Sequence, residues 1–211
     1  TLLPQLLLSE DRSIWQLARG YVKTRYDQDS WQWIDDLDMT SWNSLQKGRL
    51  MSYLPFCRET WDRADTLPPE GKSEYWTRTI MISRQAEVTE LPRAIEEFLV
   101  VDRPSDAIEC LYVARSSPQP IDASRCAEIL LTIAKEIKTS SISTIDSYYI
   151  AKLASGLKID PSTDSKQLLA VEWTYLPILL ANSSETRPLL TDEKLAEDPN
   201  FFCHTIRTVY R

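Results

Sequence analysis

Apolar residues recur at intervals of three and four along most of the chain, which is the spacing of one face of a helix. The clearest case is the segment 122–138, where Asp122 is suited to cap the first turn. Its apolar positions are Cys126, Ile129, Leu130, Ile133, Ala134 and Ile137. Similar spacing predicts further helices over residues 9–25, 42–54, 58–65, 70–82, 88–101, 103–114, 143–157 and 191–197.

The most apolar stretch is LLAVEWTYLPILL, residues 168–180. It is too densely apolar for a one-sided helix, so we expect a buried one. Asp164 and Gln167 resemble a capping box at its start, and Pro177 predicts a break near residues 173–176. Its thirteen residues fall short of the roughly 20 that a membrane-spanning helix needs.

Glu172 is the one charged residue in this stretch. A buried carboxylate needs a partner, because an unpaired one is costly in free energy. We expect Glu172 to be a structural buried charge, and Arg187 and Arg207 lie in segments that could fold back to pair with it. A carboxylate facing a wet groove and a catalytic carboxylate are the alternatives.

About ten to twelve helices joined by short loops predict an all-α fold, a series of antiparallel helix pairs. An α-solenoid, TPR-like, and an irregular right-angled helical array both fit this pattern, since no fixed repeat length is evident. We expect one helical domain over residues 1–211, with a subdivision near 83–90 as the alternative. Trp76–Ile82 has strand-like composition, but no second strand is near to pair with it.

The net charge is −7, whereas domains that bind nucleic acid usually carry a basic excess. Arg12, Arg19, Lys23 and Arg25 form a local basic strip that Asp27 and Asp29 follow at once. Weak nucleic-acid binding is therefore kept only as an alternative.

Little in the sequence indicates catalysis or a cofactor. Cys57, Cys110, Cys126 and Cys203 form no CxxC pair, and their apolar neighbours favour free, buried thiols and a reducing, cytoplasmic setting. His204 follows Cys203 directly, but adjacent helix positions diverge by about 100°, which disfavours a Cys–His pair. Asp35, Asp36 and Asp38 lack the spacing of a calcium loop. We expect no cofactor and no metal, with an all-helical enzyme of unknown reaction as the alternative.

The seven tryptophans and the paired tyrosines offer candidates for partner contacts. The partner-binding candidates are Trp31, Trp33, Trp42, Tyr148 and Tyr149. A place in the core is the competing interpretation for each, because aromatic side chains dominate core burial. The composition and the absence of a catalytic motif favour a non-catalytic interaction or scaffold domain that binds a protein or other domains of its own polypeptide.

Three stretches carry a resemblance: LPFCRETWDRAD at Leu54–Asp65, RPSDAIECL at Arg103–Leu111, and EWTYLPIL with LAEDPNFFCHTIRTVYR between Glu172 and Arg211. They resemble helical C-terminal regions of very large bacterial proteins, some of which carry an NTPase module used in antiviral defence. The resemblance implies a recognition or scaffold region, with a sensor role in phage defence and with the nucleotide chemistry elsewhere in the parent protein. The chain begins with Thr1 and ends in a helical pattern, so we expect a segment of a longer protein.

Overall fold

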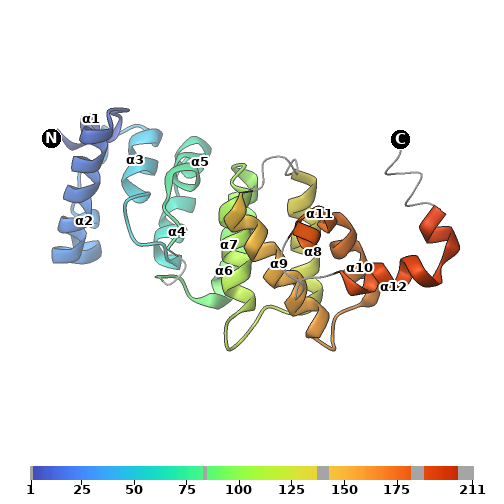
Figure 1. Cartoon of the computed structure of the whole chain (residues 1–211). Helices are drawn as coiled ribbons and strands as arrows, with labels where there is room; N and C mark the ends of the chain where they lie inside the picture. The colour runs from blue at the N-terminus through green and yellow to red at the C-terminus, as the bar shows by residue number, and fades with distance from the viewer. Residues whose placement is uncertain (1, 83–84, 137–142, 182–187, 204–211) are drawn as a thin grey trace. The chain divides into compact units, whose positions relative to one another are not determined.

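The computed structural model of the chain describes residues 2–82, 85–136, 143–181 and 188–203. These ranges contain helices and no strand, which confirms the all-α prediction (Figure 1). The helices are α1 (Leu3–Leu7), α2 (Arg12–Asp35), α3 (Ser44–Met51), α4 (Arg58–Asp65), α5 (Pro69–Arg78), the 3-10 helix η2 (Val88–Glu90), α6 (Leu91–Val100), α7 (Pro104–Arg115), α8 (Ala123–Glu136), α9 (Thr144–Ile159), α10 (Ser165–Thr174), α11 (Leu176–Ala181) and α12 (Leu189–Glu197).

The chain divides into two compact units, and each is described by itself. Unit 1 is Thr1–Arg93 and unit 2 is Ala94–Arg211, so the boundary falls inside α6. The solenoid arrangement stays a prediction.

Several helix ends follow the sequence pattern. Asp164 caps α10, since its Oδ1 accepts hydrogen bonds from the N–H groups of Lys166 and Gln167, both at 3.0 Å. Gln167 does not complete a capping box, because its side chain donates instead to Ser124 Oγ at 3.0 Å. The break predicted at Pro177 is present: α10 ends at Thr174, and α11 begins at Leu176.

Two helices run further than the pattern predicts. The helix expected over 9–25 extends to Asp35 as α2, with one non-helical residue, Ser30, at φ 51° and ψ −142°. The helix predicted over 143–157 runs on to Ile159 as α9, so Gly156 lies inside it, and no glycine in the described ranges has positive φ. Burial of Leu153 and Leu157 beside it explains how α9 tolerates the roughly 1 kcal/mol that glycine costs a helix interior.

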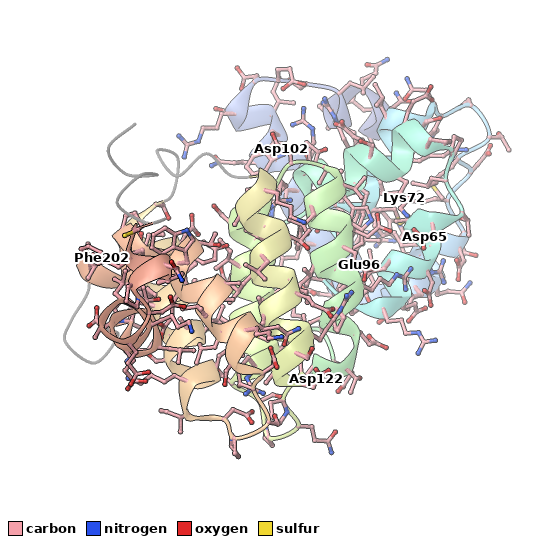
Figure 2. All side chains as sticks on the ribbon, turned by 90° about the vertical axis from the view of Figure 1, so that its right-hand side faces the viewer. Asp65, Lys72, Glu96, Asp102, Asp122 and Phe202 are labelled. Carbon is pink, nitrogen blue, oxygen red and sulfur yellow. The ribbon has the colours of Figure 1, made fainter. Side chains whose placement is uncertain are left out.

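In unit 1, α3 and α5 lie side by side (Figure 1). Their closest approach involves two glycines. A Cβ added at Gly48 would stand 2.3 Å from the carbonyl oxygen of Gly71, and one added at Gly71 would stand 2.7 Å from that of Ser44. The two helices can pack backbone to backbone only because both positions lack a side chain. Figure 2 shows the adjacent link between α4 and α5, where Lys72 Nζ lies 3.0 Å from an oxygen of Asp65.

Arg49 of α3 joins four segments of unit 1. Its buried guanidinium donates to the carboxylates of Glu74 at 2.5 Å and Glu10 at 2.7 Å, and to the carbonyl oxygen of Leu7 at 3.0 Å. Arg78 contacts the same two carboxylates. A buried charge is tolerated when it is paired and hydrogen-bonded in this way.

In unit 2, Glu172 is 2% exposed, and its partner is a helix end. Its Oε2 accepts hydrogen bonds from the backbone N–H of Thr191 at 2.7 Å and from the Thr191 hydroxyl at 2.9 Å. Thr191 is the third residue of α12, where a backbone N–H has no partner within its own helix. The carboxylate therefore caps α12, and its charge suits the positive end of the helix dipole. Arg187 and Arg207 lie outside the described residues.

We expect Gly48→Ala to destabilise unit 1 by about 1–3 kcal/mol, because the added methyl group meets a backbone oxygen. Gly20→Ala in α2 is the matched control: nothing lies within 4 Å of its new Cβ. That substitution should stabilise by about 0.5–1 kcal/mol, since alanine favours the helix interior. Urea unfolding followed by tryptophan fluorescence measures both, and equal stability of the two variants would show that α3 and α5 are not in close contact.

Glu172→Ala should lower the free energy of unfolding of unit 2 by about 1–3 kcal/mol, because it leaves buried donors on Thr191 unpaired. The Thr191 amide should also exchange its hydrogen faster, which NMR measures residue by residue. Glu193→Ala, an exposed position on the same helix, should change stability by less than about 0.5 kcal/mol. Unchanged exchange at Thr191 in the Glu172 variant would refute the capping role.

Candidate interaction surface on helices α7 and α9

A polar contact fixes how α7 and α9 lie against each other. Ser105, near the start of α7, donates through Oγ to Oδ2 of Asp146 at 2.7 Å. Asp146 is also part of the capping box that begins α9, where Ser143 Oγ accepts the Asp146 N–H at 3.1 Å. Both residues lie in the first turn of their helices, so the contact sets the register of the next turns.

Three tyrosines meet about one to two turns along from this contact. Tyr112 of α7 stacks on Tyr149 of α9, with ring centroids 4.7 Å apart and planes inclined by 27°. Tyr148 completes the cluster, with its ring centroid 6.4 Å from Tyr112 and 5.8 Å from Tyr149. The Tyr148 side chain is 49% exposed. We call these three residues the tyrosine surface.

Acidic side chains border the tyrosine surface. Burial raises the pKa of Glu109, and the nearby charges of Asp106 and Asp146 raise it further. Asp106 pairs with Arg103 at 2.9 Å, whereas Glu109 has no hydrogen-bond or ion-pair partner among the described residues. The pKa of Tyr149 is raised first by burial and then by the charge of Glu109, so the carboxylate and this ring are neighbours.

This arrangement suits a cation. Aromatic ring faces attract positive charge, and a carboxylate without a partner adds a directional acceptor. The chain itself provides an example at the edge of the cluster, where Lys152 Nζ lies 5.8 Å from the Tyr148 ring centroid.

The five aromatic residues predicted as partner contacts divide between the units. Tyr148 and Tyr149 lie together in unit 2, and Trp31, Trp33 and Trp42 lie in unit 1. Trp33 and Trp42 are buried, which leaves them little surface to offer a partner; both face the interior of unit 1. Trp31 is partly exposed, but the Arg63 guanidinium lies 4.3 Å from its ring centroid and covers it.

Sequence reasoning missed Tyr112, which completes the tyrosine surface, and Glu109, which borders it. Both lie on the side of α7 away from its buried positions Ala107, Ile108 and Leu111. Their spacing of three residues places them one turn apart on one face. Tyr112 is an aromatic residue away from the buried face of its helix, and the sequence could have marked it as a candidate for that reason. Its stacking on Tyr149 of α9 could be seen only in the tertiary structure.

The acidic residues and cysteines considered for a metal site or for catalysis have other roles in the described structure. No cluster of three His, Cys, Asp or Glu side chains suited to a metal ion occurs in the described ranges. Of the acidic trio, Asp35 pairs with Arg63, and Asp38 accepts from Thr40 at 2.6 Å. Burial raises the pKa of the Cys126 thiol to about 12, which keeps it un-ionised near neutral pH.

Of the cysteines, Cys110 and Cys126 are buried, Cys57 is partly exposed and Cys203, expected to be buried, is exposed; all four are free thiols. The histidine considered for a Cys–His pair, His204, lies outside the described residues.

Within the described part of the chain, each helix is too short or too polar to cross a membrane. Comparison of the chain with models of protein families, with curated proteins and with solved structures found no match.

The raised pKa of Glu109 gives a pH-dependent prediction. A carboxyl group whose pKa is higher in the folded state destabilises the fold increasingly as pH rises from the unfolded-state pKa through the folded-state pKa, because folding then buries its charge. Glu109→Gln should therefore raise the thermal midpoint of unit 2 at pH 7, and this gain should shrink as pH falls toward 4 and the carboxyl group protonates. Thermal melts by circular dichroism at both pH values measure the effect. A lower midpoint at pH 7 would show that Glu109 has a stabilising partner.

Proposed function

We propose that this chain is a non-catalytic, cytoplasmic interaction domain of a larger bacterial protein, and that the tyrosine surface of unit 2 contacts a protein partner. The observation that carries the proposal is the meeting of Tyr112, Tyr148 and Tyr149 near Glu109, a carboxylate with no hydrogen-bond or ion-pair partner among the described residues. Tyrosine supplies a large, rigid contact area at low entropic cost, and it is enriched where proteins bind one another.

The chemistry of the surface favours a basic partner segment. A lysine or arginine side chain could lie over the exposed Tyr148 ring while its charge approaches Glu109. Such contacts combine the cation–π attraction with a charge-assisted hydrogen bond. They also remove the electrostatic penalty that Glu109 imposes on the free protein. A residue that destabilises the free fold is common at sites kept for binding.

The test is binding of a fluorescent peptide of alternating arginine and glycine, measured by polarisation against the same peptide with citrulline in place of arginine. Citrulline keeps the shape of arginine but removes the charge. The arginine peptide should bind more tightly, and Tyr148→Ala should weaken its binding about tenfold, the loss expected for about 1.4 kcal/mol.

Tyr21→Ala is the matched control, because Tyr21 is 48% exposed but lies in unit 1. It should leave peptide affinity unchanged. Equal binding of both peptides, or equal loss in both tyrosine variants, would refute the tyrosine surface as a site for basic segments. The full-length parent protein, tested in the same way, shows whether the surface remains available there.

A further inference from the structure

One face of α2 in unit 1 is exposed and carries no charge. Before the non-helical Ser30, the other exposed positions of the helix are charged, apart from Gln16. The uncharged residues lie within about 120° of the helix circumference, at about 100° per residue. They are Ser13, Ile14, Leu17, Gly20, Tyr21, Thr24 and Gln28, all exposed, and we call them the α2 face.

The apolar part of the α2 face continues onto α1. Leu17 is 64% exposed, and Ile14 and Tyr21 on the same face are also exposed. Tyr21 lines a hollow of about 250 Å³ together with Leu2, Leu3, Leu6, Leu37 and Trp42. Because contiguous exposed apolar surface is unfavourable in water, such a patch indicates a contact with another molecule.

Gly20 lies at the centre of the α2 face without a reason within the described chain. Nothing lies within 4 Å of a Cβ added there, and its φ is not positive. Glycine destabilises a helix interior relative to alanine. Elsewhere in unit 1, Gly48 shows what a helical glycine permits, which is the approach of a second helix at backbone distance. Gly20 leaves room for the same approach from outside the chain.

Two charges at opposite ends of the α2 face indicate what approaches. Arg12 and Asp27 have no hydrogen-bond or ion-pair partner among the described residues. Both are on one helix, roughly 22 Å apart at 1.5 Å per residue, so they cannot pair within one copy. In two antiparallel α2 helices that cross at Gly20, position 12 lies opposite position 28, which brings Arg12 of each copy close to Asp27 of the other. A parallel pair would instead place Arg12 beside Arg12.

We propose that the α2 face binds a second copy of this chain, with the two α2 helices antiparallel and crossing at Gly20. Leu17 and Tyr21 of both copies cover one another, and an Arg12–Asp27 pair forms at each end. The same residues serve both partners, so the contact closes as a two-fold dimer. It is separate from the tyrosine surface, which lies in unit 2.

Sedimentation equilibrium of the full chain over a concentration series tests the proposal. The wild-type chain should show a monomer–dimer equilibrium. Leu17→Glu should raise the dissociation constant at least about tenfold, because it places an unpaired charge in the contact. Ile159→Glu, at an exposed apolar position of unit 2, should leave it unchanged. A chain that is monomeric at every concentration would overturn the proposal and leave the α2 face to a helix of another protein.

Gly20→Ala separates folding from association. In solutions dilute enough to hold monomers, it should stabilise the fold, as predicted above. The added methyl group would nevertheless stand between the crossing helices, so the dissociation constant of the dimer should rise about tenfold. An unchanged dissociation constant would overturn the crossing at Gly20.

Charge reversal tests the identity of the partner and the antiparallel arrangement. Arg12→Asp and Asp27→Arg should each weaken the dimer, because each places like charges opposite one another. The double variant should restore it, since the two charges then face each other with their signs exchanged. Restoration cannot arise within one copy, where the two positions are too far apart to touch. Failure of the double variant to recover would overturn the antiparallel pairing.

Discussion

Short helices must pack against one another to persist, and this constraint governs the whole chain. Isolated helices below about 12–15 residues are marginal in water, and α3, α4 and α5 have 8, 8 and 10 residues. Their stability therefore comes from contacts between helices. The approach of Gly48 to Gly71 lets α3 and α5 meet at backbone distance, and the Arg49 network ties them to the N-terminal segment.

Main-chain groups at helix ends satisfy the charges buried between helices. Arg49 donates to the carbonyl oxygen of Leu7, the last residue of α1, and Glu172 accepts from the first turn of α12. Each contact pairs a side-chain charge with a backbone group that has no partner within its own helix. A long-range contact of this kind fixes the end of a short helix and removes the cost of burying the charge at the same time.

Against this background, the polar groups that lack partners are informative. Glu109 and the Tyr53 hydroxyl lack a hydrogen-bond or ion-pair partner among the described residues, and burial without one costs each of them free energy. Glu109 lies near Tyr149, and tyrosine ring faces attract cations.

The sequence by itself determined the all-α class, the break at Pro177 and the cap at Asp164, because these depend on residues close together in the chain. It also singled out Tyr148 and Tyr149, and Glu172 as the charge within the apolar stretch. Only the tertiary structure decided that Glu172 caps α12, that α9 continues through Gly156, and that Trp33 and Trp42 face the interior. It also brought Tyr112 to the tyrosine surface, placed Glu109 beside that surface, and left the Tyr53 hydroxyl without a hydrogen-bond partner among the described residues. The physical reason is that partners far apart in sequence leave no local pattern, and their contacts exist only once the helices have packed.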